Sequence, residues 1–271
     1  MPSYVIVGVS KGLGFEFLRQ ISSNEKNTVV GLVRDKPATD KKIKEELGFR
    51  ANIHIIHGDL NNYESLQKAA TDTAAITGGS LDYLIANASY LSLWDAYDPI
   101  GVLARDPKGL EKELTSYLQT NIIGNINLFS LFTPLVLKGH VKKVVAISTG
   151  LSDLEMTNQY ELDTSPLYTI SKAGLNMVVA KFSAQYKKDG VLFLSICPGT
   201  VDVGHFKDMT PAQVESVQTL MGKFKSYAPH FEGQATPEDA VRDVISVWER
   251  ASLGKGDGGN FLSHFGNKQW L

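Results

Sequence analysis

The chain has a single cysteine, Cys197, among its 271 residues. One cysteine excludes an intrachain disulfide, so nothing in the sequence indicates an oxidising, secreted environment. No stretch of 18 apolar residues occurs, and Met1-Pro2-Ser3 leads into apolar residues without a basic, signal-like segment. We therefore expect no leader, no membrane span and no membrane partner, and a cytoplasmic location.

The sequence also has little excess charge and no metal-binding pattern. It carries 27 Lys and Arg against 29 Asp and Glu, a net charge of −2, whereas a nucleic-acid-binding surface normally leaves a basic excess. His54 and His57 stand three apart in a predicted strand, and this odd spacing points them to opposite faces. With one cysteine and no HExxH motif, we expect neither a nucleic-acid partner nor a metal site.

What the sequence does contain is an alternation of short apolar runs and amphipathic stretches. The apolar runs are rich in Val and Ile, as in strands covered on both faces, and strand–helix–strand repetition predicts a parallel sheet with right-handed crossovers. We predict strands at 4–7, 29–33, 53–57, 83–86, 143–147 and 192–196, and helices at 13–23, 40–47, 63–76, 110–137, 167–187, 212–224 and 237–250, the last capped by Thr236. The fold class is therefore α/β: one Rossmann-type doubly wound parallel β-sheet domain over residues 1–271, flanked by helices on both faces.

The stretch "VGVSKGLG" places Gly8, Gly12 and Gly14 between the first strand and the first helix. Glycines in such a turn allow unusual φ angles and remove Cβ atoms that would keep a phosphate away from the helix N-terminus. The spacing, G-x-x-x-G-x-G, differs from the common G-x-G-x-x-G pattern. The turn is interpreted as a pyrophosphate-binding loop, with a plain tight turn as the alternative.

Arg34, in "GLVRD", ends the second predicted strand about twenty residues after the glycine loop, where the adenosine ribose of a dinucleotide lies. An acidic residue there favours NAD(H), whereas an arginine suits the 2′-phosphate of NADP(H). Lys11 can add a second positive charge. Asp35 could instead bind the ribose, and both cations could be solvated surface groups. The pattern favours NADP(H) over NAD(H).

The stretch "SPLYTISKAGLN" places Tyr168 and Lys172 four residues apart, on one face of a helix. Ser165 and Pro166 are predicted as its N-cap and first helical residue. A nearby ammonium, together with the positive charge of an oxidised nicotinamide, lowers the pKa of a tyrosine from its usual value of about 10. Roughly one such pair is expected by chance in this composition, so its position after the fifth strand gives it weight.

Together these motifs resemble the short-chain dehydrogenase/reductase family over nearly the full chain. The matching pieces, in the order of the family, are "GVSKGLG", "GDLNN", "ANAS", "TNIIGNINLF", "AISTG", "YTISK" and "CPGTVDV". The final "GGNFLSHFGNKQWL" resembles the tail of fungal members. The resemblance implies an NADP(H)-dependent oxidoreductase that reduces a ketone or aldehyde, or oxidises the alcohol.

The resemblance also implies roles for individual residues. Tyr168 would be the general acid/base, Lys172 would lower its pKa and hold the nicotinamide ribose, and Asn121 would keep a water in a proton relay. Ser148 or Thr149 would orient the substrate oxygen, with alignment by strand favouring Thr149 and residue type favouring Ser148. Asn87 would stabilise the central strand beside the cofactor. The implied cofactor-binding residues are Gly8, Ser10, Lys11, Gly12, Leu13, Gly14, Arg34, Asp59, Leu60, Asn87, Ala88, Tyr168, Lys172, Pro198, Gly199 and Val201.

The sequence departs from the family pattern in three places. Ser89 replaces a glycine in "ANAS", Val203 stands where a threonine is usual, and "LSDLEMTNQYELDT" lengthens the interval before Tyr168. Two alternatives stay open: a non-catalytic dinucleotide-binding redox sensor, and a recruited family member that catalyses dehydration, isomerisation or cyclisation without net hydride transfer.

Irregular regions at 90–107, before Tyr168 and at 200–236 are expected to surround the substrate. Their large side chains predict a medium-sized, apolar or aromatic substrate: Leu91, Trp94, Tyr97, Met156, Tyr160, His205, Phe206 and Met209. The two longest predicted helices carry more apolar residues than one sheet face needs, namely Leu128, Phe129, Leu131, Phe132, Leu175, Val178, Val179 and Phe182. By resemblance, these helices would pair in a homodimer or homotetramer.

Overall fold

The computed structural model describes residues 1–204 and 209–271, so the predicted substrate residues His205 and Phe206 lie outside the described residues. It contains one seven-stranded parallel sheet with the strand order β3-β2-β1-β4-β5-β6-β7. The strands are β1 (Ser3–Val7), β2 (Thr28–Val33), β3 (Ile53–His57), β4 (Tyr83–Ala86), β5 (Lys143–Ile147), β6 (Leu192–Cys197) and β7 (Phe261–Ser263). The predicted Rossmann-type sheet is confirmed.

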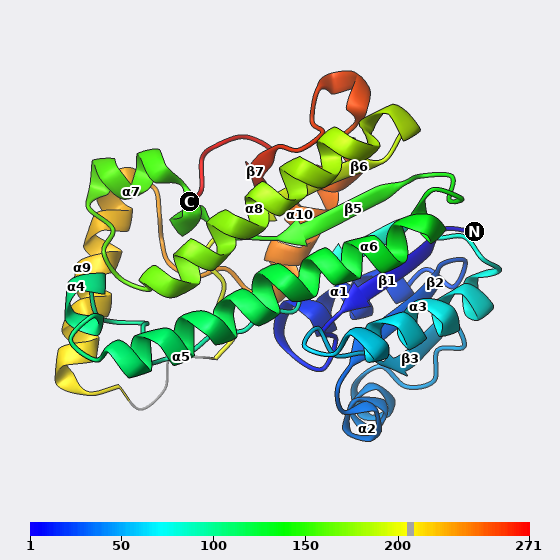
Figure 1. Cartoon of the computed structure of the whole chain (residues 1–271), viewed down its shortest axis with the longest axis horizontal. Helices are drawn as coiled ribbons and strands as arrows, with labels where there is room; N and C mark the ends of the chain where they lie inside the picture. Colours follow the sequence, from blue (N-terminus) through cyan, green and yellow to red (C-terminus); the bar gives the residue numbers. More distant parts are fainter. Residues whose placement is uncertain (205–208) are drawn as a thin grey trace.

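Helices cover both faces of the sheet. They are α1 (Gly12–Ser22), α2 (Lys36–Glu46), α3 (Tyr63–Thr77), α4 (Ile100–Leu103), α5 (Pro107–Tyr117), α6 (Gly124–Val136), α7 (Leu154–Tyr160), α8 (Pro166–Tyr186), α9 (Pro211–Tyr227) and α10 (Pro237–Arg250). One buried cluster joins α1, α2 and α10 to the sheet, and a second joins α3, α6 and α8 to the opposite face. In Figure 1, α6 and α8 run in front of the strands, and α4, α7 and α9 gather beyond the ends of the strands at the left.

The strand order reverses direction between β1 and β4, because the chain first builds outward to β3 and then returns to the other side of β1. In open parallel sheets, the crevice at such a reversal, outside the carboxyl ends of the strands, is where ligands bind. The loops after β1, β2, β4 and β5 all meet at this end. The topology therefore fixes the place of the site before any side chain is considered.

The six predicted strands and the last helix are found, and Thr236 accepts the backbone N–H of Asp239 at 3.1 Å, as expected of the cap of α10. Strand β7 was not predicted. It has only three residues, paired from Ser195↔Phe261 onward at the edge of the sheet. So short a segment offers no periodicity that a sequence could reveal.

The predicted helix 110–137 is instead three consecutive helical segments. Between α5 and α6 the chain forms one π-helical stretch, η1 (Leu118–Ile123), which contains Asn121. At its end Gly124 lies against the carbonyl of Leu60, where a Cβ atom would stand only 2.7 Å from the oxygen. Such wide turns occur mostly as single interruptions of α-helices, frequently at functional sites.

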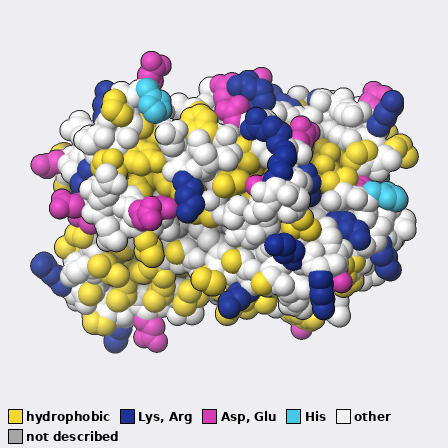
Figure 2. Space-filling model, turned by 90° about the horizontal axis from the view of Figure 1, so that it is seen from above, with side chains coloured by type: hydrophobic (Ala, Val, Ile, Leu, Met, Phe, Trp, Pro, Cys, Tyr) yellow, Lys and Arg dark blue, Asp and Glu magenta, His cyan; other side chains and the backbone are white. Residues whose placement is uncertain are grey.

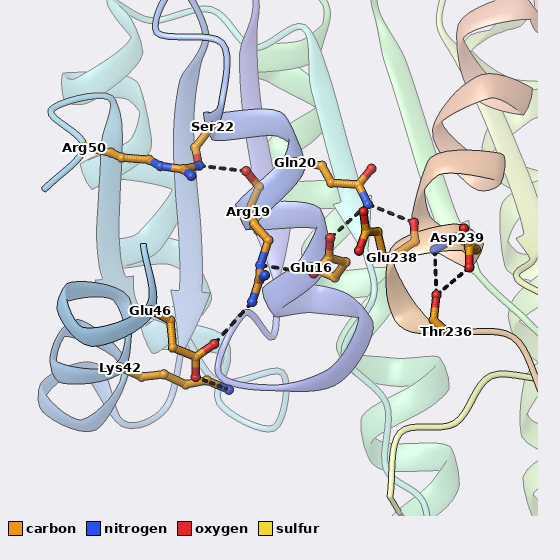
Figure 3. A network of polar contacts seen from close by, with 10 residues as sticks. All are labelled: Glu16, Arg19, Gln20, Ser22, Lys42, Glu46, Arg50, Thr236, Glu238 and Asp239. Carbon is orange, nitrogen blue, oxygen red and sulfur yellow. Dashed lines mark hydrogen bonds and ion pairs between the residues drawn. The ribbon is translucent and has the colours of Figure 1, made fainter. Parts of the chain in front are cut away.

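Polar contacts hold α1 to its neighbours on the sheet (Figure 3). Arg19 forms ion pairs with Glu16 at 3.2 Å and with Glu46 of α2 at 3.3 Å. Gln20 donates to the carbonyl of Glu238 in α10 at 2.9 Å. Exposed pairs of this kind each contribute little to stability, but together they fix the direction of a helix whose N-terminus faces the carboxyl ends of the strands.

The described part of the chain contains no helix that combines the length and apolar composition needed to cross a membrane. Within the same residues, no group of three His, Cys, Asp or Glu side chains is placed to hold a metal ion. On the face seen in Figure 2, charged side chains of both signs are scattered, with hydrophobic side chains exposed between them at the lower left.

Candidate active site

A cavity of about 380 Å³ lies at the reversal of the sheet, at the carboxyl ends of the central strands. It brings together most of the residues predicted from the sequence: Gly8, Ser10, Lys11, Gly12, Leu13, Arg34, Asp59, Leu60, Asn87, Ala88, Ser148, Tyr168, Lys172 and Pro198. Five other predicted residues do not line it: Gly14, Asn121, Thr149, Gly199 and Val201. The cavity is therefore lined both by the glycine loop and by the Tyr–Lys pair.

Two glycines of the loop, Gly8 and Gly14, are too closely packed to carry a side chain. Gly8 has a φ of +85°, and a Cβ there would lie 2.8 Å from the Cβ of Ala88. A Cβ on Gly14 would collide with the carbonyl oxygen of Gly8. The Asn87 amide donates to the carbonyls of Val7 at 3.2 Å and Gly8 at 3.3 Å. Gly14 and Asn87 thus shape the loop, even though only Asn87 faces the cavity.

The N-terminus of α1 opens into the cavity without a side-chain cap. Lys11 is its N-cap residue, makes no capping hydrogen bond, and is followed by no acidic residue in the first turn. Unpaired N–H groups and the positive end of a helix dipole bind anions such as phosphate. Lys42 was not predicted here, yet its ammonium donates to the carbonyl of Ser10 at 3.3 Å and adds positive charge beside the loop. A lysine on an exposed helix gives no signal of such a contact.

The two residues that follow β2 take different roles. Arg34 is exposed and lines the cavity. Asp35 caps α2, accepting the N–H of Ala38 at 3.0 Å, and does not line the cavity. Asp35 is therefore engaged elsewhere, and the end of β2 presents a cation to the cavity.

The Tyr168–Lys172 pair lines the same cavity. Lys172 is only 2% exposed, donates to the carbonyl of Ile147 at 2.9 Å, and lies 5.8 Å from the centroid of the Tyr168 ring. Burial lowers the pKa of Lys172 to about 8. Burial, with a smaller contribution from Cys197, raises the pKa of Tyr168 above its usual value of 10. The lowering of the pKa of Tyr168 by Lys172 together with an oxidised nicotinamide stays a prediction.

Ser148 and Thr149 have different surroundings. Ser148 borders the cavity, but its Oγ is buried and without a hydrogen-bond partner. Thr149 is partly exposed, and its Oγ1 accepts the N–H of Leu151 at 3.4 Å. A hydroxyl that accepts one hydrogen bond keeps its own hydrogen free to donate. The Thr149 hydroxyl is therefore free to donate, although Thr149 does not line the cavity, whereas Ser148 lines the cavity with a buried Oγ.

Asn121 is fully buried in η1 and holds the segment that follows β4. Its Oδ1 accepts the N–H of Tyr90 at 2.8 Å and the hydroxyl of Ser89 at 3.1 Å, and its Nδ2 donates to Ser171 Oγ at 2.9 Å. Ser89, a departure from the family pattern, thus has a partner. Its hydroxyl helps fix residues 89–91, which line the cavity. The water relay through Asn121 stays a prediction.

The start of α8 is not capped as predicted. Ser165 has a φ of +52° and makes no capping bond, and its hydroxyl donates instead to the carbonyl of Ala96 at 3.2 Å. The acceptor is Asp95, whose Oδ2 receives the N–H groups of Leu167 and Tyr168, both at 3.0 Å. No sequence signal marks Asp95, because the cap comes from a loop more than 70 residues earlier.

Of the predicted substrate residues, Leu91 lines the main cavity. Trp94 packs against Gly109, and Met156 and Tyr160 belong to a separate core cluster with α9 and Trp270. Tyr97 lines a different cavity of about 300 Å³ beside α9, and Met209 lines neither of these two. The insertion before Tyr168 is thus mainly a packing element, which its apolar composition alone did not reveal.

A model of the short chain dehydrogenase family matches residues 3–214. The chain belongs to this family of oxidoreductases. It is 56% identical, over all of both chains, to "Short chain dehydrogenase virK" of Hypocrea virens, and 54% identical, again over the full lengths, to "Short-chain dehydrogenase/reductase iacC" of Pestalotiopsis fici. Both relatives are fungal, which confirms the predicted resemblance to fungal members.

Solved structures confirm the short-chain dehydrogenase fold. An NADPH-bound carbonyl reductase from chicken fatty liver superposes with a TM-score of 0.76 at 20% identity, covering 98% of each chain. The RhlG/NADP active-site complex of Pseudomonas aeruginosa gives a TM-score of 0.73 at 17% identity, covering 99% of this chain and 96% of that one. At such identities the likeness concerns the fold.

Proposed function

We propose that this dehydrogenase uses NADP(H) to reduce a ketone or aldehyde, or to oxidise the corresponding alcohol. The observation that carries the proposal is the arrangement at the end of β2, where Arg34 lines the cavity and Asp35 caps α2. Lys11 lines the same cavity, so two cations are available to a 2′-phosphate. The NADPH and NADP named for the chicken and Pseudomonas proteins are consistent with this choice.

A dinucleotide would lie along this cavity. The side-chain-free turn at Gly8 and the uncapped N-terminus of α1 would receive the pyrophosphate. Asp59 and Leu60, which follow β3, would flank the adenine, while Pro198, Gly199 and Val201 after β6 would lie near the nicotinamide. Bound there, the reduced nicotinamide would supply a hydride to the carbonyl carbon.

The residues of this chain would handle the proton and the oxygen. Burial keeps Tyr168 neutral, and a neutral phenol can donate its proton to a carbonyl oxygen. Lys172 would stabilise the phenolate that remains, because an ammonium beside it favours the charged form. Thr149, whose hydroxyl hydrogen is free, would donate a hydrogen bond to the substrate oxygen, with Ser148 as the alternative. Protonated Tyr168 is the state that carbonyl reduction requires.

The substrate is proposed to be a medium-sized apolar or aromatic carbonyl compound or alcohol. Tyr90, Leu91 and Val203 border the same cavity as Tyr168. Apolar and aromatic linings with few polar groups are typical of sites for small organic ligands.

Fluorescence titration with NADPH and NADH tests the cofactor. We expect wild type to prefer NADPH, and Arg34→Ala to lose affinity for NADPH by about tenfold while binding of NADH hardly changes. Lys36→Ala is the matched control, because Lys36 is a nearby exposed cation outside the cavity that pairs with Asp40. Equal affinity of wild type for both nucleotides would refute the NADP(H) assignment.

Turnover of aromatic and aliphatic carbonyl probes tests the chemistry. Tyr168→Phe should bind NADPH like wild type and reduce none of the probes. Wild type that binds NADPH but oxidises none of it with any probe would favour the redox sensor. A product of altered structure formed without consumption of NADPH would indicate dehydration, isomerisation or cyclisation.

Assembly into a homodimer or homotetramer is proposed as well, with exposed residues of the long helices added to those that the sequence suggested. Leu128, Phe129, Phe132, Leu175 and Val179 are buried within the chain, whereas the predicted Leu131, Val178 and Phe182 are partly exposed. The exposed apolar side chains of the long helices are Ile170 and Met177 of α8, with Ile123, Ile126 and Leu118 on the neighbouring helical stretch. Sedimentation of wild type and of Met177→Lys tests this, because a charge there should dissociate the assembly.

A further inference from the structure

Every backbone N–H group in the first turn of α8 donates to an identified acceptor. Pro166 has no N–H, and the N–H of Thr169 donates to the carbonyl of Ser165 at 3.0 Å. The two remaining N–H groups, of Leu167 and Tyr168, donate to one oxygen of Asp95. A carboxylate at this place also interacts favourably with the positive end of the helix dipole. The local sequence supplies no cap, and Asp95 takes that role.

This carboxylate is sealed from water. Asp95 is 0% exposed, as is Tyr117, and Leu167 is 1% exposed. The Tyr117 hydroxyl donates to Asp95 Oδ1 at 2.7 Å and accepts the N–H of Ser92 at 2.9 Å. Removal of the carboxylate would leave two backbone N–H groups without acceptors where solvent is absent, and would leave the Tyr117 hydroxyl only the carbonyl of Ser92 at 3.5 Å, which is costly.

The same contacts join Tyr168 to the segment that borders the cavity. The Tyr117 ring meets the Tyr90 ring edge-on at 5.0 Å between centroids, and lies 6.3 Å from the Tyr168 ring. Tyr90 lines the cavity, and Asn121 fixes its backbone. Residues 89–95 are therefore attached at one end to η1 and at the other to the first turn of α8.

Resting on the function proposed above, we propose that Asp95 is the positioning residue of Tyr168. By holding the backbone N–H of Tyr168, it sets the place of the phenol relative to the cavity and couples that place to residues 89–91. The role depends on an acceptor oxygen at this position. A misplacement of about 1 Å can lower a turnover number about 100-fold without contact with the substrate.

Two substitutions of Asp95 separate the effect of its acceptor oxygens from the effect of its size. Asp95→Asn keeps an acceptor oxygen and the shape, whereas Asp95→Leu keeps the approximate size and loses both oxygens. With phenanthrenequinone as the carbonyl probe, we expect Asp95→Leu to lower kcat about 100-fold, with KM for NADPH and its binding within about threefold of wild type. Asp95→Asn should keep kcat within about threefold, since one oxygen can still accept both N–H groups. Wild-type kcat in Asp95→Leu overturns the proposal.

The matched control is Asp106→Ala. Asp106 is another capping aspartate of the same connection between β4 and α5, and it accepts the N–H of Gly109 at 3.1 Å, a residue of α5 and not of α8. We expect its kcat to be unchanged. If Asp95→Leu fails to fold, Tyr117→Phe is the milder variant, because it keeps the carboxylate and removes its hydroxyl donor. It should lower kcat about tenfold and leave NADPH binding unchanged, whereas an unchanged kcat counts against the proposal.

Amide hydrogen exchange tests the same point without turnover. In Asp95→Leu, protection should fall in a peptide covering residues 166–172 and stay as in wild type in peptides from α3 and α10. Unchanged exchange at 166–172, or an equal loss in all three peptides, overturns the positioning role. If wild type reduces no carbonyl, the proposed function fails, yet the exchange result still decides whether Asp95 holds the backbone of Tyr168.

Discussion

The ammonium of Lys172 donates a hydrogen bond to the carbonyl oxygen of Ile147 at 2.9 Å, and this contact joins the second turn of α8 to the last residue of β5. The carbonyl is one that ends a strand, so its acceptor is not consumed by the sheet. The lysine reaches it through a dry interior, since Lys172 is 2% exposed. A buried cation such as Lys172 affects the stability of the folded protein as well as the chemistry of the site.

The stability of the protein should depend on pH through Lys172. Burial lowers the pKa of Lys172 from 10.5 to about 8, so between these values the unfolded chain binds more protons than the folded one. The contribution of this residue to stability rises with pH across that window and is lost as the pH falls through about 8. Relative to Lys172→Met, wild type should gain up to about 1.4 kcal/mol per pH unit in the free energy of unfolding. Urea denaturation across the window measures this, and parallel curves for the two proteins would contradict it.

The hydroxyl that orients the substrate should be that of Thr149. Thr149→Val should lower kcat about 100-fold, the usual loss when one donor to a developing oxyanion is removed. Thr149→Ser should retain most of the activity. Ser148→Ala should stay within a few-fold of wild type, because Ser148 Oγ is buried. A larger loss in Ser148→Ala than in Thr149→Val would reverse the assignment.

Gly14 and Gly222 should respond oppositely to the same substitution. Both lie in helices, where alanine is normally the better residue by about 1 kcal/mol. Gly222→Ala should gain close to that amount, because nothing lies within 4 Å of the added methyl. Gly14→Ala should lose about 1–3 kcal/mol by overpacking and bind NADPH more weakly, because the methyl would collide with Gly8. Thermal unfolding and nucleotide titration of both variants measure this, and stabilisation by Gly14→Ala would contradict the described packing.

Cys197 should be inert in the folded protein. It is 3% exposed, its sulfur accepts the N–H of Gly150 at 3.0 Å, and burial raises its pKa to about 11. The thiolate is the reactive form, so at about pH 8 we expect almost no reaction with a thiol reagent until denaturant is added. Rapid labelling of native protein, read by mass spectrometry, would show that the end of β6 opens to solvent.

The sequence predicted those parts of the site that depend directly on strand ends. Gly8, Arg34 and Tyr168 each occur at a fixed place relative to a strand or helix, and parallel strands bring such places to one edge of the sheet. The order of the strands and helices along the chain is then enough to predict that these residues lie close together. The side-chain interactions at that edge could be identified only from the structure.

Three features could not be predicted because they depend on tertiary contact. The cap of α8 comes from Asp95 across more than 70 residues, in place of the adjacent Ser165. The rise in the pKa of Tyr168 comes from desolvation, which a Y-x-x-x-K pattern does not encode. Met156 and Tyr160 enter a core cluster with Trp270, so an apolar insertion became packing instead of a substrate wall.

The π-helical stretch Leu118–Ile123 also fixes the length of the chain around it. A wide turn amounts to an inserted residue in an α-helix. Deletion of one residue there would close the wide turn into a regular helix, in which each residue is rotated by about 100° from the next. Asn121, which lies inside the wide turn, would then change its direction relative to Tyr117, and the two residues would no longer hold opposite ends of one loop. A single substitution in this stretch changes one side chain, whereas a change in its length alters all the contacts that the stretch makes with the site.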